Sequence, residues 1–317
     1  MPIRCAIVMD PIASIKPIKD TSFALLLEAQ RRACELTYII PGSLGLDQGD
    51  PVALAAPIVV HDTPRDWFRL GDVQRVDLST FDVILMRLDP PVDDNYIHAT
   101  QILEIAQQRG ALVVNDPRGL RDLNEKLAAL LFPDLCPPTR VSRRADALRE
   151  FVELHGLCVL KPLDGMGGHS IFRTAPDDPN LAVILETLTA RGSRTAMAQK
   201  FLPRIVDGDK RVLLIDGEPV PYALARIPQG SDFRGNLAVG GRGEGRPLTD
   251  AERRIASVVG PEMRRRGMLL VGLDVIGEHL TEVNVTSPTC VRELDARFGI
   301  NIAGLLFDVI ETRLARA

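Results

Sequence analysis

The chain has 317 residues, 45% of them hydrophobic and 25% charged, and a formal net charge of −4. At about 150 residues per domain, this length predicts roughly two globular domains that need no disulfide or metal to stabilise a core. A slightly acidic chain with 4% aromatic residues lacks the positive field and the stacking surfaces of nucleic-acid-binding proteins, and it offers no charge attraction to an anionic membrane. The longest apolar run, residues 52–60, is too short to span a bilayer.

The cysteines and the N-terminus indicate a cytoplasmic protein. Five cysteines are scattered along the chain and form no C-x-x-C pair, which is typical of reduced thiols rather than of a zinc site or a disulfide framework. The first residues run directly into an apolar segment without a small-residue cleavage site, so we expect no signal peptide.

The first third of the chain alternates strand and helix patterns. The expected elements are a strand at 3–9, a helix from about 20 to 35, a strand at 81–86, a helix at 95–108 and a strand at 111–114. The adjacent prolines at 90 and 91 end one strand, because they cannot continue a hydrogen-bonded ladder. This order predicts a parallel sheet with helices on both faces, an α/β architecture.

The remainder of the chain has a different texture, in which helices and hairpins are mixed. We expect helices at 120–131, 145–155, 180–190 and 249–266 and one after residue 285, with strands at 157–163, 170–173, 195–202, 211–215, 218–225, 268–276 and 280–285. Residues 227–246 are rich in glycine and poor in apolar residues, which is typical of a lid or of a disordered loop.

The last strand pair gathers polar side chains on one face. With a three-residue turn centred on Glu278, the expected cross-strand pairs are Ile276 with Leu280, Asp274 with Glu282 and Gly272 with Asn284. Facing carboxylates repel each other, and a divalent cation would relieve that repulsion. Oxygen ligands from Asp274, Glu282 and Asn284 suit Mg²⁺, whereas the alternative interpretation is a solvated polar face.

Two further segments carry cations and glycines. Lys161 leaves a strand and enters a glycine turn at 164–170, whose backbone N–H groups could approach phosphates, although such a turn also suits a plain hairpin. Arg211, Arg226 and Arg234 have guanidinium forks that bind carboxylates or phosphates, with surface salt bridging as the alternative. Together these segments predict a cation-rich site with Mg²⁺ ligands and without a covalent nucleophile. Such a site fits phosphoryl transfer, in which the protein positions groups and neutralises charge.

With these segments in view, the sequence resembles the bacterial glutathione synthetases of the ATP-grasp superfamily over nearly its whole length. The matching stretches are AIVMDPI (6–12), VILMR (83–87), DPP (89–91), KPLDGMGG (161–168), GDKRVL (208–213), ARIPQG (225–230), GLD (272–274) and EVNVTSPT (282–289). His169 is bulkier than the residue expected there, and Phe233 adds an aromatic side chain to the lid.

The resemblance implies an ATP-grasp fold of the α/β (α+β) class, with an N-terminal Rossmann-like parallel-sheet domain. It divides the chain into an N-terminal domain (1–120), a lid subdomain with the glycine loop (121–203) and a C-terminal subdomain with metal and substrate sites (204–317). It implies an ATP-dependent carboxylate–amine ligase that joins γ-L-glutamyl-L-cysteine to glycine through an acyl phosphate. It further implies Mg²⁺, with Mn²⁺ as a possible substitute, and a homotetramer.

Site residues follow from the same resemblance. The implied ATP-binding residues are Lys126, Lys161, Gly165, Gly167, Gly168, Gln199, Lys200, Phe201, Leu202 and Asp209. Arg211 and Arg226 would face the reacting carboxylate together with Asn284, Ser287 and Thr289, and Asp274, Glu282 and Asn284 would hold the metal. Arg234 belongs to the implied catalytic lid, which maps onto residues 227–242.

Two alternatives remain at this stage. Another carboxylate–amine ligase, of the D-alanine–D-alanine or glutamate-adding kind, would share the same frame but have different pocket residues. A non-catalytic ATP-binding module could also keep the frame, although such a module would be expected to lose a metal ligand or the lid.

Overall fold

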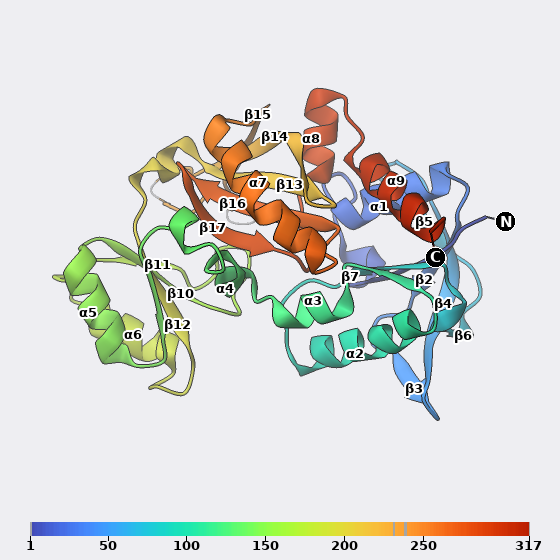
Figure 1. Ribbon diagram of the computed structural model, residues 1–317, viewed down its shortest axis with the longest axis horizontal. Coiled ribbons are helices and arrows are strands. Elements are labelled where there is room, and N and C mark those ends of the chain that lie inside the picture. Colours follow the sequence, from blue (N-terminus) through green and yellow to red (C-terminus); the bar gives the residue numbers. More distant parts are fainter. Residues whose placement is uncertain (1, 231, 238–239, 317) are drawn as a thin grey trace.

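The computed structural model describes residues 2–230, 232–237 and 240–316 (Figure 1). Within these ranges the strands form three sheets, one in the N-terminal part, one in the middle of the chain and one in the C-terminal part. The expected lid at 227–242 lies outside the described residues at 231 and 238–239. None of the described helices is long and apolar enough to cross a membrane.

The N-terminal sheet has the order β3-β4-β2-β1-β7-β8, with β5 and β6 also paired to β4. Its strands are β1 (Arg4–Met9), β2 (Glu35–Ile39), β3 (Gly45–Asp47), β4 (Asp50–Val60), β5 (Phe68–Leu70), β6 (Gln74–Asp77), β7 (Val83–Arg87) and β8 (Leu112–Val114). The expected parallel core is confirmed, because β1 pairs in parallel with β2 and β7, and β7 with β8. The strands between residues 45 and 77 add an antiparallel extension that the sequence patterns did not predict.

Helices cover both faces of this sheet, and alternate residues of β1 pack into the hydrophobic cores on its two sides. The helices are α1 (Thr21–Arg31), α2 (Asp94–Gln108), α3 (Pro117–Asp122) and α9 (Ile302–Leu314), while α8 (Val291–Phe298) packs between α1 and the C-terminal sheet. Ala6 and Val8 belong to the hydrophobic core on the α2 side, whereas Cys5 and Ile7 belong to the core that contains α1 and α9. The last helix of the chain therefore returns to the N-terminal sheet (Figure 1).

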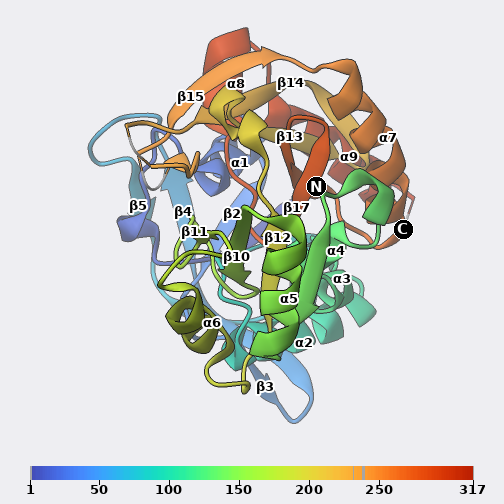
Figure 2. The same cartoon turned by 90° about the vertical axis from the view of Figure 1, so that its left-hand side faces the viewer.

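The middle sheet is antiparallel, with the order β11-β10-β12-β9. It consists of β9 (Thr139–Ser142), β10 (Cys158–Pro162), β11 (Phe172–Thr174) and β12 (Ala196–Lys200). Figure 2 shows α5 (Ala145–His155) and α6 (Leu181–Thr189) in front of these strands, and their apolar sides form a separate small core with the sheet. The glycine loop connects β10 to β11 and is the part of this unit nearest the C-terminal sheet.

The C-terminal sheet is antiparallel, with the order β15-β14-β13-β16-β17. Its strands are β13 (Asp209–Ile215), β14 (Glu218–Ile227), β15 (Arg242–Pro247), β16 (Leu270–Ile276) and β17 (His279–Asn284). Helix α7 (Asp250–Arg265) packs on this sheet and begins with the expected capping box between Thr249 and Glu252. The short helix α4 (Glu125–Ala129) lies against β17.

Several expected element boundaries are wrong. Helix α1 ends at Arg31, and Glu35 already belongs to β2. The expected helix at 120–131 is two helices, α3 and α4, because the side chain of Asn124 accepts hydrogen bonds from the backbone of a new first turn. The single expected C-terminal helix is divided into α8 and α9 at Gly299, whose φ of 64° ends a helical turn. Residues 242–247 form β15 rather than a loop.

Candidate active site

The polar face of the β16–β17 hairpin forms in nearly the predicted register. Asp274 pairs with Glu282 and Gly272 with Asn284, as expected. A bulge between Asp274 and Val275 shifts the remaining pairs, so that Ile276 faces His279 and the predicted pairing with Leu280 is wrong. The two facing carboxylates border two open cavities that meet at this hairpin.

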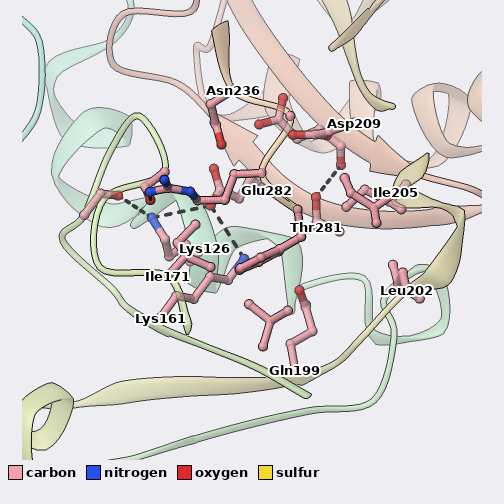
Figure 3. Close-up of a pocket in the computed structure, with 18 of the residues that line it drawn as sticks. Lys126, Lys161, Ile171, Gln199, Leu202, Ile205, Asp209, Asn236, Thr281 and Glu282 are labelled. Atoms are coloured by element: carbon pink, nitrogen blue, oxygen red, sulfur yellow. Dashed lines mark hydrogen bonds and ion pairs between the residues drawn. The ribbon is translucent and has the colours of Figure 1, made fainter. Parts of the chain in front are cut away.

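Four cations of the protein surround the acidic pair. Arg211 Nε donates to Asp274 Oδ1 at 2.6 Å, and Arg226 Nη2 lies 2.9 Å from Asp274 Oδ2. Glu282 Oε1 lies 3.4 Å from Lys126 Nζ and 3.6 Å from Lys161 Nζ (Figure 3). The repulsion that sequence reasoning assigned to a metal ion is therefore already compensated by protein charges.

The neighbouring cations lower the pKa values of both Asp274 and Glu282. Burial acts to raise the pKa of Asp274, but the neighbouring guanidinium groups of Arg211 and Arg226 outweigh it and hold that pKa below its usual range. Burial also acts to raise the pKa of Glu282, but the ammonium groups of Lys126 and Lys161 outweigh it and lower that pKa. Both groups are ionised at neutral pH and present a negative centre enclosed by cations.

The first cavity lies between the middle and C-terminal sheets, and the space within it, including the part open to solvent, is about 840 Å³. All the residues expected to bind ATP line it: Lys126, Lys161, Gly165, Gly167, Gly168, Gln199, Lys200, Phe201, Leu202 and Asp209. Figure 3 shows Lys126, Lys161 and Glu282 together at one end and Gln199 and Leu202 at the other. The cavity thus has a cationic end and a less charged end where strand β12 leaves the sheet.

Two cationic side chains from different parts of the chain hold the backbone of the glycine loop. Lys126 Nζ donates to the carbonyl oxygen of Gly165 at 2.6 Å, and Arg234 Nη1 donates to that of Gly168 at 2.9 Å. Gly168 has a φ of 85°, and a Cβ atom there would lie 2.8 Å from Asn236 Oδ1. A side chain at Gly168 would therefore separate the glycine loop from residues 233–236, which also line the cavity.

The second cavity adjoins the N-terminal sheet and has an empty volume of about 1150 Å³. The expected substrate residues line it: Arg211, Arg226, Asn284, Ser287 and Thr289. Arg211 Nη1 donates to Thr289 Oγ1 at 3.4 Å, so the same guanidinium group contacts Asp274 in the β16–β17 hairpin and the segment after β17. Since Asp274 and Glu282 line both cavities, a ligand in one can meet a ligand in the other at this pair.

Asp209 and Asp274 contact the same guanidinium group, that of Arg226. The carboxyl group of Asp209 accepts a hydrogen bond from Arg226 Nη2 at 2.5 Å, while Asp209 Oδ1 is buried and has no hydrogen-bond partner among the described residues. Burial raises the pKa of Asp209 to about 6, with Asp274 adding to the shift and Arg226 opposing it.

The donor set of the hairpin fits a hard divalent cation. Among the described residues no three His, Cys, Asp or Glu side chains cluster as a metal site, so the carboxylates must be supplemented by another donor. Asn284 provides one, because its Nδ2 donates to the carbonyl oxygen of Gly272 at 3.1 Å and its amide oxygen is left as a free acceptor. Mg²⁺ usually takes only one or two carboxylates and completes its shell with phosphates and water.

Sequence reasoning missed several residues of the second cavity. Glu125, Asp20, Asp89 and Glu293 line it, as do Lys16 and Lys19. Asp89 lies in the DPP stretch of the resemblance, and Glu125 directly precedes Lys126. For Asp89 and Glu125, position in or beside a recognised motif was the available signal.

Known proteins similar to this chain identify its family. Residues 3–121 match the family model described as prokaryotic glutathione synthetase, N-terminal domain, and residues 125–299 match its ATP-grasp domain. The chain is 64% identical over 316 residues to a glutathione synthetase of Xanthomonas campestris pv. campestris, covering 100% of both chains. It is 58% identical over 314 residues to that of Pseudomonas syringae pv. tomato, covering 99% of this chain and 98% of the relative.

Solved structures show the fold. A D-cycloserine synthetase superimposes with a TM-score of 0.67 at 16% identity, covering 98% of this chain and 99% of that chain. A RimK domain ATP-grasp protein from Sphaerobacter thermophilus gives a TM-score of 0.60 at 20% identity, covering 96% and 98%. The fold is the expected ATP-grasp fold, and the full-length relatives decide between the ligase classes left open by the sequence. The chain belongs to the prokaryotic glutathione synthetases, ATP-dependent ligases of the ATP-grasp superfamily.

Proposed function

We propose that the two cavities hold ATP and γ-L-glutamyl-L-cysteine and that the reaction occurs where they meet, beside Asp274 and Glu282. A carboxylate oxygen of the dipeptide attacks the γ-phosphorus of ATP, and the bond to ADP breaks. The amine of glycine then attacks the carbonyl carbon of the acyl phosphate. Phosphate leaves with the former carboxylate oxygen, and the amine gives up a proton. The observation that carries this proposal is that one acidic pair borders both cavities.

In the nucleotide half, Lys126 and Lys161 neutralise the phosphates from below the glycine loop. Both ammonium groups already lie within 3.6 Å of a carboxylate oxygen, so they are positioned for an anion. The backbone of Gly165, Gly167 and Gly168 covers the phosphates. Residues 199–202 hold the adenine, and Asp209 supports the ribose end.

Asp274, Glu282 and Asn284 would hold Mg²⁺, with Mn²⁺ as a possible substitute. The bound ion would neutralise charge on the phosphates during transfer. In the chain itself Glu282 contacts two lysines, and incoming phosphates compete for those lysines. The carboxylate is thereby released for another cation, which makes ion and nucleotide binding mutually supportive.

In the acyl half, Arg211 and Arg226 face the reacting carboxylate and stabilise the oxyanion that forms when glycine attacks. Their orientation is fixed before substrate arrives, because Asp274 binds both guanidinium groups and Asp209 binds Arg226. Ser287 and Thr289 line the dipeptide pocket. Pre-oriented cations cost no reorganisation during the reaction, which is the basis of their catalytic effect.

Water must be kept from the acyl phosphate, and Arg234 contributes to this. It contacts the glycine loop at Gly168, and its guanidinium group is held by Asp232 at 2.7 Å. Residues 227–242 thus act as a lid over the nucleotide cavity.

The proposal includes the division of labour along the chain. The nucleotide cavity and the metal ligands come from residues 121–203 and 204–317. Residues 1–120 complete the dipeptide pocket. We also propose a homotetramer in the cytoplasm, on family resemblance. The five free cysteines suit the reducing conditions of that compartment.

Isotope transfer tests the proposed path. With γ-glutamylcysteine labelled by ¹⁸O in its cysteinyl carboxylate, the phosphate released should carry one ¹⁸O per turnover, and tripeptide should form only when ATP, Mg²⁺, dipeptide and glycine are all present. Unlabelled phosphate from a reaction that yields tripeptide would exclude the acyl phosphate. Hydroxylamine in place of glycine should give the hydroxamate of the same dipeptide.

A further inference from the structure

The carboxylate of Glu125 supports the segment that follows β17. Glu125 Oε1 accepts hydrogen bonds from the backbone N–H of Val285 at 3.0 Å, from the backbone N–H of Thr286 at 3.1 Å and from Thr286 Oγ1 at 2.8 Å. These donors lie 160 and 161 residues away in the sequence. Residues 287 and 289, one and three positions further on, line the second cavity.

The neighbours of Glu125 bind the other half of the site. Asn124 Nδ2 donates to the carbonyl oxygen of Leu163 at 3.1 Å, and Lys126 Nζ donates to that of Gly165 at 2.6 Å. Three consecutive side chains at the start of α4 therefore connect the glycine loop to the segment after β17. The first turn of α4 is a fixed point between the two cavities.

Glu125 is held by neutral donors rather than by a cation. Among the described residues it forms no ion pair within 4.0 Å, and burial raises the pKa of its carboxyl group. The side chain of Glu125 is partly buried at the wall of the second cavity, and three convergent hydrogen bonds to its Oε1 atom compensate for the contact with water that it loses there. Losing the carboxylate would leave two backbone donors and one hydroxyl without their acceptor, so the segment would be free to shift.

We propose that Glu125 is a positioning residue for the dipeptide, acting through the 285–289 segment to set the wall formed by Ser287 and Thr289. The inference rests on the proposed function in one respect, that this wall contacts γ-glutamylcysteine. Glu125 itself takes no part in the chemical steps. Its effect is on the affinity for one substrate and not on the rate of phosphoryl transfer.

The test is a set of KM and kcat measurements for ATP, γ-glutamylcysteine and glycine in four single variants and one double variant. Glu125→Ala removes the acceptor, and Glu125→Gln keeps a carbonyl oxygen that can accept the same hydrogen bonds. Thr286→Val removes the hydroxyl donor and remains informative if Glu125→Ala does not fold. Glu28→Gln is the matched control, because Glu28 is a buried carboxylate held by Arg31 and Arg32, remote from both cavities.

Loss of one or more hydrogen bonds predicts that Glu125→Ala raises the KM for the dipeptide by about tenfold or more, while the KM for ATP stays within about twofold. Glu125→Gln should stay within about threefold of wild type. Thr286→Val alone should raise the KM for the dipeptide by about two- to fivefold, because it removes one of the three hydrogen bonds, and it should change little when added to Glu125→Ala. Unchanged dipeptide KM, or an equal rise for all substrates, would overturn the proposal. A rise for glycine alone would instead refute the assignment of the wall, and Ser287→Ala would then show the same shift.

Discussion

Gly272→Ala tests whether Arg211 must lie where the structure has it. Gly272 faces Asn284 in the β16–β17 hairpin, and a Cβ atom there would lie 2.8 Å from Arg211 Cδ, 3.1 Å from Arg211 Nε and 3.1 Å from Pro288 Cβ. The first contact is closer than carbon atoms approach in proteins, so Arg211 has to move. Its hydrogen bond to Asp274 is only 2.6 Å long, and a shift of the Nε atom breaks it.

Displacing one pre-placed donor in an active site costs roughly 3 to 4 kcal/mol in the barrier, so kcat/KM for the dipeptide should fall by about 100-fold or more. Overpacking at a buried strand should lower the free energy of unfolding by about 1 to 3 kcal/mol. Coupled ADP-release kinetics and urea unfolding measure the two effects. Gly243→Ala is the control, since its Cβ atom would lie at an ordinary 3.5 Å from Leu224. A folded Gly272→Ala enzyme with kcat/KM within threefold of wild type would refute the reasoning.

Three further predictions concern the lid and a remote carboxylate. Arg234→Ala, which loses the contact with Gly168, should raise ATP hydrolysis without glycine relative to ligation, and an unchanged ratio would contradict shielding. Phe233→Ala should raise the KM for ATP about two- to fivefold, because the Phe233 ring lines the nucleotide cavity and lies 5.4 Å from the guanidinium carbon of Arg173; an unchanged KM would mean that this side chain is dispensable for ATP binding. Hydrogen bonds from Arg31 lower the pKa of Glu28 from 4.5 to about 2, so Glu28→Gln should cost about 2 to 3 kcal/mol of stability at pH 7, measured by urea unfolding. That cost should shrink as the pH falls from about 5 towards 2, and a cost independent of pH would contradict the ion pair.

The elements with a strong period were predictable. Strand alternation and an assumed turn at Glu278 put Asp274 opposite Glu282, because one face of the hairpin is apolar and a shift by one residue would bury the acids. The bulge beside Asp274 leaves the alternation on either side intact, so nothing in the pattern revealed that Ile276 faces His279. The break at Asn124 was missed because apolar residues continue on both sides of it.

Residues that act through distant partners were not predictable. Lys161 stood out, since it interrupts an apolar strand, and the resemblance supplied Lys126. Glu125 showed no local signal, because its three hydrogen bonds join residues 160 or more positions apart. The four cations around the acidic pair were likewise visible one at a time, but only the fold brings them together. Charge balance at a buried site is a property of tertiary structure.

Binding of Mn²⁺ followed by electron paramagnetic resonance, with a non-hydrolysable ATP analogue present, tests the metal assignment at the border of the cavities most directly. Glu282→Gln removes a carboxylate from the donor set while freeing Lys126 and Lys161 for the phosphates. The account predicts that, without a divalent cation, this variant binds the nucleotide analogue at least as well as wild type, and that with the analogue present it binds Mn²⁺ at least about tenfold more weakly. Equal Mn²⁺ affinity in the two proteins would contradict a metal site at Asp274, Glu282 and Asn284.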